Sequence, residues 1–171
     1  MRPVPRLETS RLTLREWLAG DAAPHAAMCA DPEVMRYMSG VLDEAESWRR
    51  MALHAGHWVL RGYGNWVLER REDGAFVGRA GFWNPEGWPG LEIGWMLARP
   101  AWGNGYATEA ARAALAWGWK TLECERVISL IKPDNRASLA VAERLGMQPL
   151  RRDTLGGAVV EILALDRPWH C

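Results

Sequence analysis

Alternating apolar and polar residues predict the strands of this chain. Between Leu91 and Leu97 every second residue is a large apolar one, and the positions between them hold Glu92, Gly94 and Met96. A period of two places alternate residues on opposite faces of a sheet, so Glu92 and Met96 share a face. Similar patterns predict further strands at residues 11–17, 65–71, 75–83, 126–131, 147–153 and 159–165, after an unstructured arm at residues 1–8.

Apolar residues at helical spacing, together with capping residues, predict the helices. Asp21 caps a short helix that ends near Cys29, and Asp43 or the residues just after it begin a longer helix that reaches about Leu60. Further helical segments are expected at residues 31–38, 106–120 and 136–145. The order of strands and helices along the chain predicts an α+β fold with a mixed sheet.

Two glycines stand between the strand at residues 91–97 and the Ala-rich helix that follows it. Gly103 and Gly105 allow the backbone to turn sharply, and the free N–H groups of the helix's first turn point outward. Such a turn can bind a phosphate or a diphosphate. A Rossmann G-x-G-x-x-G would need glycine at Thr108, and no P-loop sequence is present. The pattern leaves two interpretations open, an anion site and a simple tight turn.

Composition and charge narrow the function classes. The chain has 171 residues, 49% of them hydrophobic, so we expect a single domain over residues 1–171 with its own core. Because 21 basic residues balance 21 acidic ones, neither nucleic acid nor a membrane surface is predicted as the main partner. No apolar run approaches the roughly 20 residues of a membrane span, and the N-terminus lacks the apolar core of a signal peptide. We therefore expect a cytoplasmic protein.

Cysteine and histidine usage predicts neither a disulfide framework nor a metal site. Cys29, Cys124 and Cys171 are few and far apart in the sequence. His54 and His57 stand three residues apart on a predicted helix, but no third or fourth ligand is recognisable, and a zinc site needs three or four. No hydrolase signature such as G-x-S-x-G is present, so hydrolysis is not predicted.

Three segments resemble the GNAT superfamily of N-acetyltransferases. Residues Pro100–Ala110 are similar to the family's Pro-x-x-Gly-x-Gly-Tyr-Ala-Thr-Glu-Ala acyl-CoA segment. Asn135-Arg-Ala-Ser138 followed by Glu143-Arg-Leu-Gly146 resembles its Asn-x-x-Ser…Leu-Gly-Phe segment, and the run from residue 7 to 15 resembles the opening of the RimJ/RimL branch. The resemblance implies the GNAT fold, in which a mostly antiparallel sheet is flanked by about four helices and splayed at the acyl-CoA site.

In that family, loop amides bind the diphosphate of coenzyme A, and an amine attacks the acetyl-CoA thioester directly. The resemblance implies an acetyl-CoA-dependent N-acetyltransferase that acts on a protein N-terminal α-amine or a small-molecule amine, in a family whose members often form homodimers. A backbone N–H near Met96–Leu97 would bind the developing oxyanion. The residues that the resemblance assigns to the cofactor are Met96, Leu97, Trp102, Gly103, Asn104, Gly105, Tyr106, Ala107, Thr108, Asn135 and Ser138.

The chain departs from the family pattern at two positions. Pro100 stands where many members carry Gln or Arg beside the diphosphate, and Ala142 stands where many carry the Tyr that protonates the departing thiolate. The Asn-x-x-Ser motif makes Ser138 the candidate for that proton donor, with a hydrogen bond to the preceding helical turn as its alternative role. Glu92 is the candidate base for the amine, with an ion pair to Arg79 as the alternative.

The sequence is also compatible with two other functions. Because Ala142 offers no hydroxyl, one alternative is a catalytically silent CoA-binding module. The less favoured alternative is a nucleotide-binding protein that uses the same glycine turn. Tyr37, Trp48 and Trp58 on the predicted helices are candidate pocket residues, although plain core packing is the favoured role for them.

Overall fold

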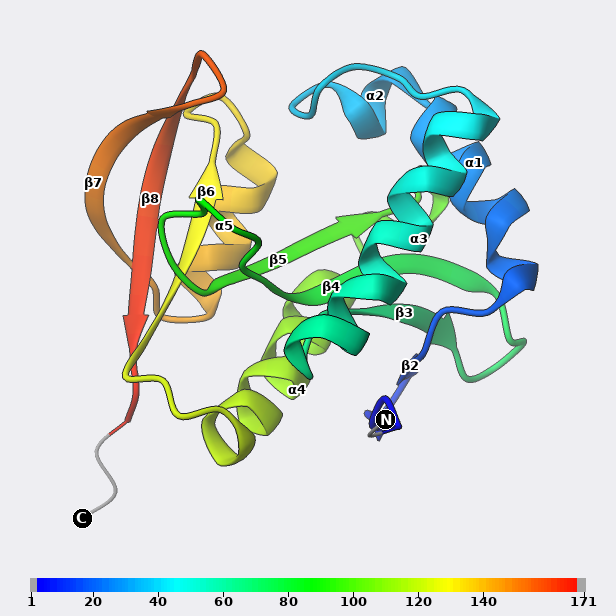
Figure 1. Ribbon diagram of the computed structural model, residues 1–171, viewed down its shortest axis with the longest axis horizontal. Coiled ribbons are helices and arrows are strands. Elements are labelled where there is room, and N and C mark those ends of the chain that lie inside the picture. Colours follow the sequence, from blue (N-terminus) through cyan, green and yellow to red (C-terminus); the bar gives the residue numbers. More distant parts are fainter. Residues whose placement is uncertain (1–2, 169–171) are drawn as a thin grey trace.

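Eight strands form one sheet at the centre of the molecule (Figure 1), and the computed structural model describes residues 3–168. The strand order is β1-β2-β3-β4-β5-β6-β8-β7, and only the pair β5–β6 is parallel. This topology confirms the predicted α+β fold with a mixed, mostly antiparallel sheet. The strands are β1 (Leu7–Glu8), β2 (Leu12–Arg15), β3 (Asn65–Arg70), β4 (Phe76–Trp83), β5 (Glu92–Leu97), β6 (Arg126–Ile131), β7 (Gln148–Leu155) and β8 (Ala158–Asp166).

Helices cover both faces of the sheet. In Figure 1, α1 to α3 lie in front of the strands, and α4 and α5 lie behind them. The described residues form five α-helices, one at each helical segment that the sequence predicts, whereas the family resemblance implied about four. The segment predicted at residues 31–38 is a helix of one turn, in which the Asp31 carboxylate accepts a hydrogen bond from the Glu33 N–H. The helices are α1 (Ala22–Ala30), α2 (Pro32–Met35), α3 (Glu44–Arg61), α4 (Tyr106–Thr121) and α5 (Arg136–Arg144).

The N-terminal segment is more ordered than the sequence predicts. Leu7 and Glu8 pair with Leu14 and Thr13 as an edge strand, so the expectation of an unstructured arm at residues 1–8 is wrong for these two residues. Upstream of them, the Pro5 carbonyl accepts a hydrogen bond from the Trp66 indole over 2.8 Å. A strand of two residues is too short to show alternation, so only its pairing with β2 reveals it.

Small residues bring α4 close to the sheet. Ala110, Ala111 and Ala114 have no exposed surface and belong to the main apolar cluster, which also contains Phe82 of β4. At Gly118 a Cβ atom would lie 2.3 Å from the Phe82 ring. The Ala-rich sequence therefore fixes the distance between α4 and the strands that carry the glycine turn.

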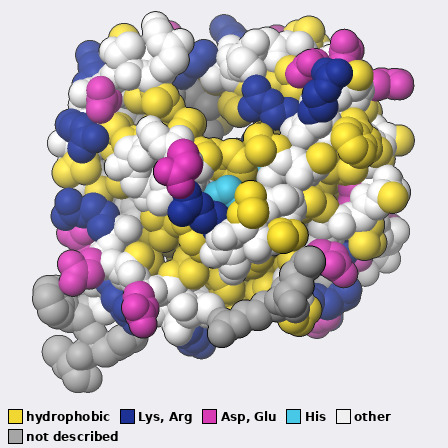
Figure 2. All heavy atoms as spheres, in the orientation of Figure 1, with side chains coloured by type: hydrophobic (Ala, Val, Ile, Leu, Met, Phe, Trp, Pro, Cys, Tyr) yellow, Lys and Arg dark blue, Asp and Glu magenta, His cyan; other side chains and the backbone are white. Residues whose placement is uncertain are grey.

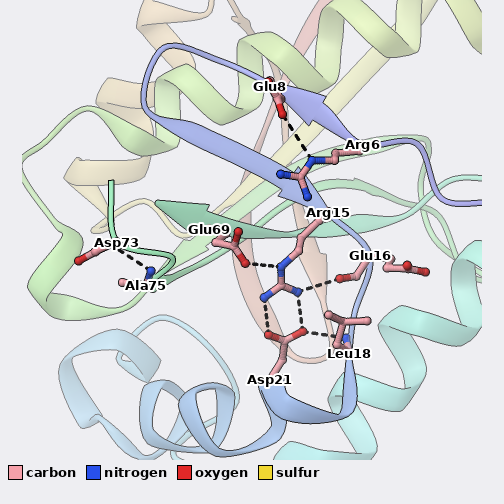
Figure 3. Close-up of polar contacts among 9 residues, drawn as sticks. All are labelled: Arg6, Glu8, Arg15, Glu16, Leu18, Asp21, Glu69, Asp73 and Ala75. Atoms are coloured by element: carbon pink, nitrogen blue, oxygen red, sulfur yellow. Dashed lines mark hydrogen bonds and ion pairs between the residues drawn. The ribbon is translucent and has the colours of Figure 1, made fainter. Parts of the chain in front are cut away.

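A buried ion-pair network ties the start of the chain to the sheet (Figure 3). Arg15 of β2 donates to both oxygens of Asp21, each over 2.8 Å, and its Nε donates to Glu69 of β3 over 2.6 Å. Asp21 also accepts the Leu18 N–H over 2.8 Å. Every oxygen of the Asp21 carboxylate is thus hydrogen-bonded, which suits a charged group in a buried position.

No described helix is long and apolar enough to cross a membrane. Cys29 and Cys124 are free thiols, and Cys171 lies outside the described residues. Within residues 3–168, no three His, Cys, Asp or Glu side chains lie close enough together to hold a metal ion.

Candidate active site

The glycine turn presents a row of free backbone N–H groups. Gly103 and Gly105 adopt φ of 76° and 77°, a conformation that favours glycine, and α4 begins at the next residue, Tyr106. The first main-chain bond of the helix runs from the Glu109 N–H to the Gly105 carbonyl over 3.1 Å. The N–H groups from Gly103 to Thr108 find no acceptor within residues 3–168. This is the geometry that binds anions at a helix N-terminus.

The Glu109 carboxylate, in the first turn of helix α4, stabilises the glycine turn through Arg11. Glu109 accepts hydrogen bonds from Thr9 Oγ1 over 2.6 Å, from the Arg11 N–H over 3.0 Å and from Arg11 Nε over 2.7 Å. Arg11 Nη1 in turn donates to the Asn104 carbonyl over 2.8 Å. The Asn104 side chain donates to the Ala101 and Trp102 carbonyls. Asn104 therefore shapes the turn through its side chain.

β5 and β6 run parallel but separate after a short contact. Glu92 pairs with Ile128, and the Ile128 N–H donates to the Leu91 carbonyl over 2.9 Å. At the next step the Ser129 hydroxyl donates to the Ile93 carbonyl over 2.5 Å. Beyond this point no described strand pairs with that edge of β5. The sheet therefore opens between β5 and β6, as predicted.

Backbone groups of alternate β5 residues face this opening. Met96 pairs with Arg79 of β4, and the Ala98 N–H also donates to β4. Because successive residues of an antiparallel strand direct their hydrogen-bonding groups to opposite sides, Leu97 faces the opening. Its carbonyl accepts the Trp102 indole over 2.9 Å, and its N–H has no acceptor within the described part of the chain. Leu97 is therefore the member of the predicted Met96–Leu97 pair that supplies a free N–H.

A cavity of about 750 Å³ occupies the opening and extends across the sheet to α1 and α3. Figure 2 shows the surface hollowed between the elements β6 to β8 and the helices α2 and α3. Four of the predicted site residues line it, namely Glu92, Met96, Asn135 and Ser138. The predicted residues Trp102 to Thr108 do not line this cavity, since they form the turn beyond the end of β5.

The Glu92 carboxylate lies inside the cavity in a partly buried position. Trp88 Nε1 donates to it over 2.8 Å. Burial raises the pKa of Glu92 from 4.5 to about 7, while the hydrogen bonds from Trp88 and the Leu130 backbone oppose that rise. Arg79 is not within 4.0 Å of the carboxylate, so the alternative of a direct ion pair is not formed.

Ser138 lies on the first turn of α5, and its side chain reaches the cavity. Asn135 caps this helix by accepting the Ser138 N–H over 3.2 Å. The Ser138 hydroxyl makes no hydrogen bond to any described residue, so the bond to the preceding turn is not formed either. Ala142, one turn further along α5, has no exposed surface and packs in the main cluster.

The sequence does not predict several of the residues that line the cavity, and it names Tyr37 only as a candidate. Tyr37 lines the cavity and donates to the Asp134 carbonyl over 3.1 Å, whereas Trp48 is 58% exposed and Trp58 belongs to the core. Arg79 and His54 also line the cavity. They come from β4 and α3, and no local motif connects them.

The fold and this opening define a class of protein in which a mixed sheet opens between two parallel strands and a glycine turn leads from the sheet into a helix. The family profile described as "Acetyltransferase (GNAT) domain" matches residues 11–148. The chain belongs to this family of acetyltransferases, which use acetyl-CoA. This confirms the resemblance seen in the sequence and the predicted acyltransferase activity.

Individual relatives agree with the family assignment. The uncharacterized protein YkkB of Bacillus subtilis (strain 168) is 38% identical over 152 residues, which cover 86% of this chain and 87% of YkkB. An acetyltransferase structure from Agrobacterium tumefaciens str. C58 is 30% identical, covers 96% of each chain and superposes with a TM-score of 0.85. The ribosomal L7/L12 α-N-protein acetyltransferase RimL, solved in complex with coenzyme A, shares the fold with a TM-score of 0.79 at 18% identity over 95% of this chain and 98% of its own.

Proposed function

We propose that this protein transfers an acetyl group from acetyl-CoA to a primary amine by direct attack of the amine on the thioester. The main support is the opening between β5 and β6: Glu92 and Ser138 line its cavity, and the free N–H of Leu97 lies further along the same edge of β5. The acceptor class is a protein N-terminal α-amine or a small-molecule amine. Location in the cytoplasm, a single domain and homodimer formation stay predictions from the sequence.

The residues at the turn fit the charged part of coenzyme A. The N–H groups from Gly103 to Thr108 would bind the diphosphate through the backbone, since the side chains of Tyr106, Ala107 and Thr108 are buried. A Cβ atom at Gly103 would meet no atom of the chain within 4 Å, so that side of the turn is open to a ligand. Met96, Asn135 and Ser138 line the cavity, and together with Leu97 and Trp102 at the end of β5 they would contact the rest of coenzyme A, with Met96 and Leu97 beside the thioester.

Acetyl-CoA supplies an activated acyl group, and the protein's own residues manage the protons. Deprotonating an α-amine of pKa near 8 at pH 7 costs about 1 kcal/mol, against about 4.6 kcal/mol for a lysine side chain. A carboxylate with a pKa of about 7, such as Glu92, is a suitable base for the first kind of amine. The Leu97 N–H would donate to the carbonyl oxygen as negative charge develops on it. Ser138 would donate a proton to the leaving sulfur.

Binding and turnover, measured separately, test the proposal. Calorimetry should show saturable binding of acetyl-CoA and none of ATP or NAD, and a thiol-detecting reagent should report release of coenzyme A with at least one amine of a panel. Binding without turnover would favour the silent CoA-binding module. Binding of ATP or NAD in preference would favour the nucleotide-binding protein. Ser138→Ala should lower turnover about 100-fold with little effect on acetyl-CoA affinity, if the hydroxyl is the proton donor.

A further inference from the structure

The cavity carries more unpaired positive charge than negative charge. Its only acidic lining residue in the described chain is Glu92, whereas three basic residues line it: Arg50, Arg79 and Lys132. None of these three lies within 4.0 Å of a carboxylate from residues 3–168. Arg50 and Lys132 reach only neutral oxygens, of Ser39 and Met38 respectively. The electrostatic field of the cavity therefore favours an anionic group.

Arg79 is the cation that lies deepest in this region. Its Nη1 donates to Asn65 Oδ1 over 2.7 Å, and its buried Nε has no partner within the described residues. Burial lowers the pKa of Arg79 from 12.5 to about 10, so the guanidinium is still charged at neutral pH. Glu92 acts on this charge only through space, without a direct ion pair, and the buried Nε–H points to a missing acceptor.

His54 of α3 also has a buried ring nitrogen without a hydrogen-bond partner among the described residues. Its Nδ1 is buried without a partner, and within residues 3–168 it shares that condition with Arg79 Nε alone. Both residues line the same cavity, one from α3 and one from β4. Burial, followed by the charge of Arg79, lowers the pKa of His54, so its imidazole is neutral and offers one N–H and one lone pair.

A pair of glycines separates this cationic end from Glu92. Gly81 of β4 faces Gly94 of β5, between the pairs Arg79–Met96 and Trp83–Glu92. Arg79 reaches Asn65, which is itself paired with Gly81. Glu92 Oε1 lies 3.7 Å from where a Cβ of Gly94 would stand. The Arg79 and Glu92 side chains therefore both extend toward the Gly81–Gly94 pair, where no side chain separates them, but they make no direct contact.

We propose that the acceptor is a small amine that also carries an oxyanion, with Arg79 and His54 binding the oxyanion and Glu92 facing the amine. The proposal rests on the proposed function and narrows its acceptor class. An α-amino acid has the required pair of groups, and Trp83 and Trp88 in the cavity wall favour one with an apolar or aromatic side chain. Polyamines carry no anionic group, and the N-terminal residue of a protein carries an amide in place of the carboxylate beside its amine.

Matched acceptors test the proposal on the full-length protein. Aromatic and aliphatic α-amino acids are compared with their own amides and with spermidine, and thiol release at saturating acetyl-CoA gives kcat/KM. We expect the free acids to exceed their amides at least 10-fold, as a charge-assisted hydrogen bond to Arg79 predicts. Equal or greater turnover of amides or spermidine overturns this inference and leaves the proposed function standing. No release with any amine overturns both.

Variants of Arg79 test whether this side chain causes the preference for free amino acids over their amides. Arg79→Gln should lower kcat/KM for the acids at least 10-fold more than it lowers kcat/KM for the amides, and should leave the affinity for acetyl-CoA unchanged. Arg79→Lys should keep part of the preference. Arg126→Gln, which changes an exposed arginine paired with Asp166 outside the cavity, is the matched control and should behave as the wild type. An equal loss for acids and amides in Arg79→Gln would show a structural role and overturn the inference.

Discussion

Glu92 shows how much one side chain depends on its surroundings. A carboxyl group of this type ordinarily titrates near 4.5, but burial between β5, β6 and Trp88 raises the pKa of Glu92 to about 7. The residue is then half ionised near neutral pH, which allows it to accept a proton from an amine and release it again. The sequence indicated Glu92 through strand alternation, whereas its pKa comes entirely from the tertiary environment.

Replacing Glu92 should change the pH dependence of the reaction. Above pH 7 the wild-type carboxylate is ionised, so kcat/KM should rise through about pH 7, and Glu92→Gln should lose that rise and fall roughly 100-fold at pH 8. The measurement is a pH profile of thiol release. Glu86→Gln, at an exposed carboxylate paired with Arg61, is the control. An unchanged profile in Glu92→Gln would remove Glu92 from the mechanism.

The same substitution has a thermodynamic signature. Because the folded-state pKa of Glu92 lies above its unfolded value, the folded protein binds more protons between pH 4.5 and 7, and stability falls as the pH rises through that window. Glu92→Gln removes this loss, so the variant should gain about 1–3 kcal/mol of unfolding free energy relative to the wild type between pH 5 and pH 8. Urea denaturation at the two pH values measures it.

At the scale of elements, glycine positions distinguish tight packing from open space. Gly118 of α4 lies against Phe82, whose ring a Cβ would approach to 2.3 Å, whereas a Cβ at Gly56 of α3 would meet no atom within 4 Å. Gly118→Ala should therefore destabilise the protein by about 1–3 kcal/mol through overpacking. Gly56→Ala should stabilise it by about 0.5–1 kcal/mol, because alanine favours a helix interior. Thermal unfolding of both variants decides whether α4 packs as closely as described.

The elements also show where sequence patterns succeed and fail. The strand at residues 91–97 and the helix that starts at Tyr106 agree with the structure within a residue or two, because both carry strong periodicity. The edge strand β1 was missed, since pairing and not periodicity creates it. Asn135 and Ser138 were identified through a local motif, and the structure places both at the cavity. Their chemical roles stay predictions.

For the whole molecule, the network around Arg15 joins β2 to β3 and to the segment that follows β2. Asp21→Ala should destabilise the protein by about 3–5 kcal/mol, because the largely buried Arg15 loses its bidentate carboxylate partner. Asp166→Ala, which removes an exposed partner of Arg126, should change stability by about 1 kcal/mol or less. Urea denaturation of the two variants gives the comparison, and equal effects would contradict a special role for the buried network.

The sequence by itself determined the features that depend on neighbours along the chain. These are the order of most strands and helices, the glycine turn at Gly103 and Gly105, the capped helix at Asn135, and the face of β5 that carries Glu92. Each arises from periodicity, capping or backbone freedom over a few residues.

Only the tertiary structure decided which distant residues meet. Arg79, Asn65 and His54 lie on three different elements, and strand register together with helix packing brings them to one cavity beside Glu92. Burial, charge and free hydrogen-bonding capacity at such a site depend on the whole packing arrangement. Local patterns therefore predicted the cofactor side of the site, whereas the proposed acceptor side became visible only when the sheet was assembled.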